Sequence, residues 1–594
     1  MNAPEVSPCR ATRVSCLVLA AVFVAGLLHL GVRLRDVQVT AAADYNYASS
    51  RQAVRRVQTA GLRGNIYDRR GVLLAGDRTA LSIICNPSFF QQRTWNESVA
   101  AIGAAISNVA SVVGLPPSLS GETIRRHVVQ SQAMPLVVWR DVGDEPLARF
   151  AEHERALPGF SLVETDERRY PHGTLAAHLI GYVGHERGTA VAGDERFSFY
   201  LPELRGRSGL EYYYDGYLSG VPGERKLQVD ARGFTTREWT VVEPQRGLDL
   251  RLTLDVGIQQ EVERQLRGER GACVVLDPRD GAVLAMASAP GFDPNDFTPT
   301  LRRDVYERHV DDPAKPLLDR AAGGAYAPGS TFKPVTALAA LGVGYPADAS
   351  YCCDGVFALG RMKLHCARRW GHGEIDLRHA LMKSCNPFFC NLGMEAGTNV
   401  LGATARAFGL GSKTGIDLSV DMAGVVPDGE WKLGRYHEPW YQGDLAQMSI
   451  GQGMLLVSPL QMALVAGALG TGCLVTPHLK ADLPAVRRPL PFPQEHLRIV
   501  REGMRMVVAG DGGDSGSGWR GGEGVPVAVS GKTGTAEIGR GETRRKNTWF
   551  IAYARRAPIE VAVALVIENG ESGGGTTAPK VRNILADIFG EVTR

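Results

Sequence analysis

The chain contains 594 residues, with a formal net charge of +3 at pH 7, 22% charged residues and 44% hydrophobic residues. This length predicts two or more domains, and the composition excludes an intrinsically disordered chain. The basic residues are spread along the sequence instead of forming blocks. Nucleic acid is therefore not expected as a partner.

An apolar run of 19 residues, 14–32, follows a short N-terminal segment. As a helix this run would be about 28 Å long, which is enough to cross a bilayer. A cleaved signal peptide is the alternative, with residues 41–43 (Ala-Ala-Ala) as the cleavage site. The run is long for a signal, and the charged segment 33–36 separates it from that site. We therefore expect a cytoplasmic tail at 1–13 and an uncleaved transmembrane anchor at 14–32.

Residues 37–245 alternate short β-like and helical stretches and contain no catalytic constellation. We expect them to form an α+β domain, called the pedestal domain below, ahead of a second domain at 247–594. A strand with its core at 250–254 is predicted to begin the second domain. Residues 273–286 are then predicted to form a β-hairpin with its turn at 278–281.

Three further strands are predicted at 525–530, 549–554 and 561–567, and helical segments rich in Ala and Leu accompany them. The predicted fold class is therefore α+β, with one sheet flanked by helices. A Gly/Ser-rich tract at 510–524 precedes the first of these strands and is expected to be a mobile loop.

The string Ser330-Thr331-Phe332-Lys333 precedes an apolar, Ala/Leu-rich stretch that predicts a buried helix. Pro334 is tolerated only in the first turn, so the helix must begin close to Ser330, whose hydroxyl then lies at a helix N-terminus. Lys333 follows on the same face. A serine nucleophile needs a base, and a lysine can be that base if burial and nearby cations lower its pKa. We predict these two roles for Ser330 and Lys333.

The string Ser384-Cys385-Asn386 follows a predicted helix at 377–383. A hydroxyl at Ser384 can pass a proton between the nucleophile, the base and the leaving amine, and the Asn386 amide can orient a substrate amide. Alone the string is weak, because most isolated serines of this kind are helix caps on the surface.

The string Lys532-Thr533-Gly534-Thr535 comes at the end of the predicted strand 525–530. Lys532 and Thr533 can bind a substrate carboxylate, and Gly534 lets a ligand backbone approach the strand closely. The N–H groups of Thr535 and Ser330 would together form an oxyanion hole.

These S-x-x-K, S-x-N and K-T-G strings, in this order, are the signature of penicillin-binding proteins and serine β-lactamases. The chain resembles class B penicillin-binding proteins over nearly its whole length. The resemblance also rests on segments 63–75, 169–184, 206–211, 230–233, 449–453 and 458–461. It implies an elongated α+β pedestal domain and a transpeptidase domain built on an antiparallel sheet flanked by helices.

Segment 369–377, which leads into 384–389, resembles penicillin-binding protein 2, the class B enzyme of cell elongation. This resemblance implies a D,D-transpeptidase that cross-links peptidoglycan stem peptides through a Ser330 acyl-enzyme and is inhibited by β-lactam antibiotics. It places the catalytic domain in the periplasm, held by a single-pass anchor in the inner membrane. It also implies partners: a SEDS-family membrane glycosyltransferase and proteins of the elongation complex. Asn386 stands where many relatives of this subtype carry Asp, and either side chain can bind a substrate amide.

Some relatives of penicillin-binding protein 2 hold a zinc ion at positions that correspond here to Cys353, Cys366, His372 and Cys385. Three thiolates and one imidazole make a suitable tetrahedral set, and a structural zinc would anchor the S-x-N string. Two alternatives remain open. Cys353 and Cys366 could form a disulfide, or Cys385 could be a small buried apolar residue.

Three other functions compete with the elongation transpeptidase. A β-lactamase or D,D-carboxypeptidase is the closest, since Glu395 and Asn399 have the spacing of a deacylating loop. These residues begin only 11 positions after Ser384, so we expect them at the end of the same helix. A division-type class B transpeptidase is the second. A penicillin-binding sensor or scaffold is the third, but a sensor needs a cytoplasmic effector, and only about 13 residues precede the anchor.

Overall fold

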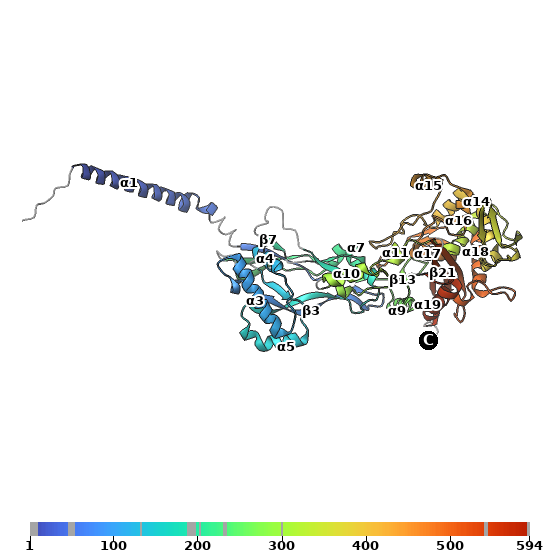
Figure 1. Ribbon diagram of the computed structural model, residues 1–594, viewed down its shortest axis with the longest axis horizontal. Helices are drawn as coiled ribbons and strands as arrows, with labels where there is room; N and C mark the ends of the chain where they lie inside the picture. The colour runs from blue at the N-terminus through green and yellow to red at the C-terminus, as the bar shows by residue number, and fades with distance from the viewer. Residues whose placement is uncertain are drawn as a thin grey trace, which may run out of the picture.

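The computed structural model describes residues 10–45, 54–130, 134–186, 198–200, 203–229, 235–298, 301–539 and 545–590. Residues 1–9, the family-like segment 230–233 and the middle of the loop between the last predicted motif and its partner strand lie outside the described residues. The molecule is elongated. Figure 1 shows the N-terminal helix at one end, the pedestal domain in the middle and the second domain at the other end.

The N-terminal helix α1 (Arg10–Arg35) contains the whole predicted anchor and extends beyond it at both ends. A short π-helical turn (Asp36–Thr40) continues it. An 18-residue window within Val14–Thr40 has a mean hydropathy of 2.3, and none of that window is buried against the rest of the protein. The helix is thus long and apolar enough to cross a membrane, as a single-pass anchor requires.

The pedestal domain contains two larger sheets. The first has the strand order β10-β9-β1-β7 and the second the order β11-β2-β3-β4, with β5 also paired to β3. The strands are β1 Val54–Thr59, β2 Ile66–Tyr67, β3 Leu73–Cys85, β4 Leu136–Trp139, β5 Phe160–Arg169, β6 Val183–Glu186, β7 Ser198–Tyr200, β8 Glu203–Gly206, β9 Gly223–Val229, β10 Thr235–Val242 and β11 Leu250–Arg251. The helices are α3 Trp95–Val113, α4 Gly121–Gln130, α5 Asp144–His153, α6 Ala177–Ile180, α7 Gly209–Tyr213 and α8 Asp215–Leu218.

A buried ionic network joins two of the family-like segments of the pedestal to Arg168, which directly precedes a third. Both Glu211 oxygens are engaged: Arg63 Nε donates to one at 2.6 Å and Arg168 Nε to the other at 2.7 Å. All three side chains are at most 3% exposed. Burial alone would raise the pKa of Glu211, but the two guanidinium groups outweigh it and lower that pKa. The family-like strings here therefore hold the pedestal together.

The second domain is built on one antiparallel sheet with the strand order β13-β12-β22-β21-β20. Its strands are β12 Gly271–Leu276, β13 Val283–Ala289, β20 Val529–Ile538, β21 Arg545–Arg556 and β22 Ile559–Glu568. Its helices are α9 Val256–Leu266, α10 Arg303–Asp311, α11 Arg320–Gly323, α12 Lys333–Gly342, α13 Leu377–Lys383, α14 Asn386–Ala407, α15 Gly429–Tyr436, α16 Gln442–Ser449, α17 Pro459–Thr471, α18 Gln494–Ala509 and α19 Ala578–Gly590. The predicted α+β class and the flanked antiparallel sheet are confirmed.

Helices cover both faces of this sheet, so its strands are apolar on both sides. Alternate residues of β12 show the two faces: Val275 packs in the cluster with α9 and α19, whereas Val274 packs in the cluster with α12 and α17. The face with α12 is the one on which the serine string lies.

Small two-stranded sheets complete the domain: β14 (Tyr351–Cys353) with β17 (Gly373–Ile375), β15 (Val356–Leu359) with β16 (Met362–His365), and β18 (Cys473–Val475) with β19 (Arg487–Pro489). The predicted hairpin at 273–286 is confirmed by the pairing of β12 with β13.

Two strand predictions were wrong in their details. The strand predicted at 525–530 begins only at Val529 and runs through the K-T-G string to Ile538, because 525–528 forms a bend instead of pairing. The strand predicted to begin the second domain is two residues long, and it pairs with β2 of the pedestal domain. Alternating apolar residues mark burial, but they do not show which sheet a strand joins.

Candidate active site

Ser330 lies in a short 3-10 turn (Gly329–Phe332) that leads directly into α12. Pro334 occupies the first turn of α12, where its missing N–H costs nothing, so the predicted helix start is confirmed. Ser330 is half-buried, while Lys333 one turn on is fully buried. The candidate nucleophile is thus open to a ligand, and the candidate base is shielded from water.

The structure brings the three strings together around the Ser384 hydroxyl. Lys532 Nζ donates to Ser384 Oγ at 2.9 Å, and Lys333 Nζ lies 3.3 Å from the same oxygen. Lys333 Nζ also donates to the Ser384 carbonyl and to Asn386 Oδ1, both at 2.7 Å. The hydroxyl therefore bridges Lys333 and Lys532, called the lysine pair below, and every predicted polar group of the S-x-N string is engaged.

Ser384 ends α13 in the left-handed conformation, with φ 56° and ψ 43°. This backbone region is disfavoured for a residue with a side chain, and such residues concentrate at functional sites. Asn386 begins the next helix, α14, and its amide nitrogen donates to the His365 carbonyl at 2.9 Å. Two helix ends and the β15–β16 hairpin thus fix the string between them.

Both lysines of the pair are fully buried, and burial disfavours their charged forms. Burial lowers the pKa of Lys333 to about 8. Burial, and then the charge of Lys333, lower the pKa of Lys532 well below its usual range. A neutral amine at Lys333 is consequently accessible near neutral pH, as a general base requires.

The K-T-G string lies inside β20, paired along its length with β21. A Cβ at Gly534 would come within 2.9 Å of the Pro328 carbonyl oxygen, and one at Gly329 (φ +55°) within 2.8 Å of the Thr535 carbonyl oxygen. These close approaches explain both glycines, since any larger residue would push β20 away from the turn that carries Ser330. The two segments predicted to supply the oxyanion hole are therefore neighbours.

One neighbour of the K-T-G string was not found from the sequence. Ser517 Oγ lies 3.1 Å from Thr533 Oγ1, and Ser517 N donates to the Met382 carbonyl. Ser517 belongs to the Gly/Ser tract that we expected to be a mobile loop. In the structure this tract packs on the sheet, where Gly518 and Gly521 leave room for the Phe550 ring. Nothing in its composition marks Ser517 as a site residue.

The four predicted metal ligands also converge. These are Cys353, Cys366, His372 and Cys385, whose sulfur and nitrogen atoms all lie within 4.8 Å of one another. The three cysteines are buried free thiols. We call the four residues the cysteine–histidine cluster. Cys385 Sγ lies 3.3 Å from Cys353 Sγ, and Cys366 Sγ lies 3.4 Å from His372 Nδ1. A hydrogen bond from Cys385, above all, lowers the pKa of Cys366 to about 3.

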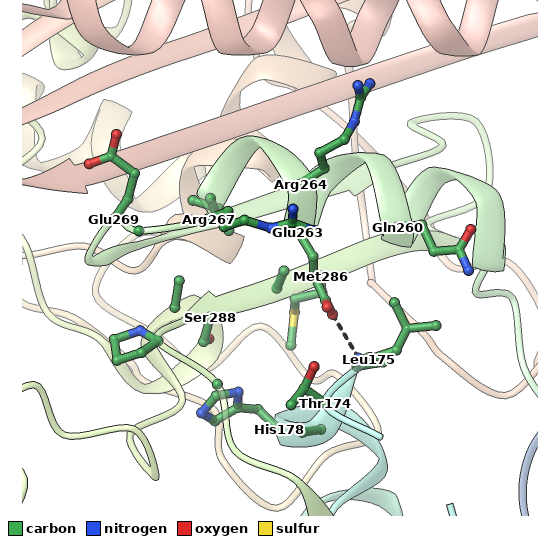
Figure 2. Close-up of a pocket in the computed structure, with 18 of the residues that line it drawn as sticks. Thr174, Leu175, His178, Gln260, Glu263, Arg264, Arg267, Glu269, Met286 and Ser288 are labelled. Carbon is green, nitrogen blue, oxygen red and sulfur yellow. Dashed lines mark hydrogen bonds between the residues drawn. The ribbon is translucent and has the colours of Figure 1, made fainter. Parts of the chain in front are cut away.

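A separate cavity of about 790 Å³ lies where the pedestal domain meets α9 and β13. Figure 2 shows Glu263 and Arg264 on α9, and Arg267 just after its end, above Thr174, Leu175 and His178 of the pedestal. Glu263 accepts a hydrogen bond from the Ala176 N–H at 2.7 Å, so it joins the two domains. No residue of the three strings lines this interdomain cavity.

Comparison with known proteins shows to which family this arrangement belongs. The sequence profile described as "Penicillin binding protein transpeptidase domain" matches residues 271–586, and "Penicillin-binding Protein dimerisation domain" matches residues 58–252. The chain belongs to the penicillin-binding proteins. The transpeptidase profile alone spans more than half of the chain. The predicted family therefore accounts for the three strings, the pedestal and the flanked sheet.

Similarity extends over nearly the whole chain to penicillin-binding protein 2. The peptidoglycan D,D-transpeptidase MrdA of Escherichia coli (strain K12) is 30% identical over 97% of this chain and 92% of its own length. A solved complex between the penicillin-binding protein PBP2 and MreC from Helicobacter pylori matches with 27% identity and a TM-score of 0.76, covering 91% of this chain and all of that one. A structure titled "Structural coordination of polymerization and crosslinking by a peptidoglycan synthase complex" matches with 27% identity and a TM-score of 0.71, covering 97% of this chain and 98% of that one.

Proposed function

We propose that this penicillin-binding protein is a peptidoglycan D,D-transpeptidase of cell-wall elongation. The observation that carries the proposal is the buried lysine pair bridged by Ser384 Oγ beside a half-exposed Ser330 at the start of α12. The similarity of the chain to the peptidoglycan D,D-transpeptidase MrdA indicates which reaction it catalyses.

Ser330 Oγ attacks the carbonyl carbon of the penultimate D-Ala of a stem peptide. Lys333, as the neutral amine, takes the serine proton, and the N–H groups of Ser330 and Thr535 stabilise the oxyanion. Ser384 passes the proton on to the leaving amine, which departs as D-Ala. Lys532 and Thr533 hold the terminal carboxylate, and Asn386 orients the peptide amide. An amine of a neighbouring strand then attacks the acyl-enzyme, which forms the cross-link and frees Ser330.

The geometry of α14 argues against a hydrolytic enzyme such as a β-lactamase or a D,D-carboxypeptidase. The Glu395–Asn399 segment, which has the spacing of a deacylating loop, lies where Gly397 (φ 76°, ψ 161°) breaks α14 into two helical stretches. The stretch that begins after Ser384 thus ends within this segment, as expected, and the second stretch follows directly and runs to Ala407. A stable acyl-enzyme, and not rapid drug turnover, is the expected behaviour with β-lactam antibiotics.

The cysteine–histidine cluster fits a structural zinc ion. Sulfur atoms about 2.3 Å from a tetrahedral zinc are about 3.8 Å apart, close to the separations in this cluster. Zinc would hold these four side chains in place and so fix the Ser384–Asn386 string, which follows one of the ligands. It takes no part in the acyl transfer.

The same relatives suggest the cellular setting. α1 serves as the membrane anchor, and the pedestal and transpeptidase domains face the periplasm. A SEDS-family membrane glycosyltransferase and elongation proteins, including one of the MreC type, are the proposed partners. The solved relatives that contain PBP2 with MreC and a peptidoglycan synthase complex support this proposal.

Incubation of the full-length protein in detergent with a fluorescent penicillin tests the function. The wild type should form a one-to-one adduct that persists for hours by mass, and Ser330→Ala should form none. Loss of the adduct with release of hydrolysed drug would identify a β-lactamase instead. Absence of any adduct would favour a scaffold.

A further inference from the structure

The nucleophile loop, Tyr326–Gly329, which leads into Ser330, is held from several sides. The main chain of Tyr326 exchanges two hydrogen bonds of 2.9 Å with Val457, and Gly329 N donates to the Gly451 carbonyl at 2.8 Å. These contacts fix the path of the loop. Trp549 Nε1 also donates to the Ala327 carbonyl at 3.0 Å, and the Tyr326 side chain adds a further polar anchor.

That side chain reaches an acidic group at the end of β22. Tyr326 Oη donates to Glu568 Oε1 at 2.9 Å. The same carboxylate accepts from Arg320 Nε at 2.9 Å and forms an ion pair with Arg270 Nη2 at 3.0 Å. Glu568 therefore bridges two cations and the nucleophile loop. None of these groups belongs to the three catalytic strings.

Arg320 makes the position of this carboxylate rigid. Its side chain is 1% exposed, and its two remaining nitrogens donate to the carbonyls of Ala314 (2.7 Å) and Lys315 (3.0 Å). A buried guanidinium with all its nitrogens engaged cannot follow a moving partner. Arg320 and Tyr326 share the Oε1 atom of Glu568, and Arg270 pairs with Oε2, so the carboxylate is held by two cations and in turn holds the Tyr326 hydroxyl.

The surroundings of Glu568 extend toward the K-T-G string on one side and toward the interdomain cavity on the other. Beyond Glu568 the chain turns under β20, where Gly573 N donates to Thr535 Oγ1 at 3.3 Å. In the other direction, Arg270 and Ala314 line the interdomain cavity. The network therefore runs from the joint with the pedestal domain to the nucleophile loop and to the edge of the K-T-G string.

We propose that Glu568 is a positioning residue for acyl transfer, which through the Tyr326 hydroxyl fixes the loop that sets the place of Ser330 Oγ. The inference rests on the proposed function, since it concerns the rate at which Ser330 is acylated. Misplacement of a nucleophile by about 1 Å can cost about 10²-fold in rate. Binding of the ligand should change little, because neither side chain belongs to the groups proposed to bind it.

Two variants test the proposal. Tyr326→Phe deletes only the hydroxyl and should lower the acylation rate constant about 10-fold, the effect of one hydrogen bond to a charged group. Glu568→Gln keeps an acceptor for Tyr326 but removes the charge that holds the two arginines, and should lower the rate constant about 10-fold to 100-fold. The double variant should be no slower than Glu568→Gln alone, since both changes break one linkage.

The sheet itself supplies a matched control. At the far end of β22, Glu560 accepts a hydrogen bond from Tyr553 Oη at 3.0 Å and pairs with Arg555 at 3.0 Å. Tyr553→Phe and Glu560→Gln remove the same kind of contact between β21 and β22, at the opposite end of β22 from Glu568. Both should acylate within about twofold of the wild type.

Stopped-flow acylation of the full-length protein by a fluorescent penicillin separates the rate constant from the affinity of the initial complex. A fall in the rate constant with an affinity unchanged within about twofold supports the proposal. Wild-type rates in Tyr326→Phe overturn it, even if Glu568→Gln fails to fold. An equal fall in the two control variants would also overturn it, because the effect would then be general loosening of the sheet. A wild type without a Ser330 adduct would instead refute the proposed function.

Discussion

The Ser384 hydroxyl accepts from one lysine of the pair at 2.9 Å and lies 3.3 Å from the other, so Ser384→Ala tests the bridge directly. Each hydrogen bond to a charged group contributes about 1.5–3 kcal/mol, and a loss of that size from the transition state slows a reaction by about 10-fold to 150-fold. We expect acylation by a fluorescent penicillin to slow about 10²-fold. The stability should fall by only about 1 kcal/mol, because Lys333 keeps the Ser384 carbonyl and Asn386, and Lys532 keeps the Thr533 carbonyl at 3.0 Å.

Ser517→Ala is the matched control. This hydroxyl also lies beside the K-T-G string, 3.1 Å from Thr533 Oγ1, but it contacts neither lysine of the pair. Its loss should change the rate by less than about threefold. Rate constants come from stopped-flow fluorescence at saturating drug, and melting temperatures show that both variants are folded. A Ser384→Ala variant that acylates within about threefold of the wild type would refute the proposed bridge.

Three further predictions follow from burial and charge. Burial lowers the pKa of Lys333 to about 8, and only the neutral amine is a base. The acylation rate should therefore rise about 10-fold from pH 6 to pH 7 and level off above pH 8. A flat profile from pH 6 to pH 9 would contradict this role. Cys366→Ser should lower bound zinc from about one equivalent to less than a tenth, measured by metal analysis without chelator, and a zinc-free wild type would rule out the site. Glu211→Ala leaves Arg63 and Arg168 buried without their shared carboxylate, so it should destabilise the protein by about 3–5 kcal/mol in denaturant unfolding; an unchanged unfolding midpoint would show that the network is dispensable.

The catalytic strings could be assigned from the sequence because their chemistry is local. Pro334 forces α12 to begin near Ser330, and the spacing of one turn then brings Lys333 to the same face. The cysteine–histidine cluster was predicted from the family resemblance, and its four side chains do meet. The fold class followed from strands and helices whose periodicity is visible in the chain.

Other features depend on contacts between distant segments. Ser517 reaches Thr533 only because the Gly/Ser tract packs on Phe550, and its sequence predicts a loop. The strand predicted to open the second domain pairs with the pedestal domain, because hydrophobic alternation does not specify a partner strand. Glu568 carries no motif, and it meets Tyr326, 242 residues away, through the closure of the sheet.

The sequence alone determined the anchor helix, the fold class and the family, and it predicted the nucleophile and its base, because short-range spacing and residue type carry that information. Only the tertiary structure decided how the lysines share the Ser384 hydroxyl, how burial lowers their pKa values, and what holds the nucleophile loop. Desolvation and hydrogen-bond geometry are properties of packed surroundings, so they arise only when segments far apart in the chain enclose the same few atoms.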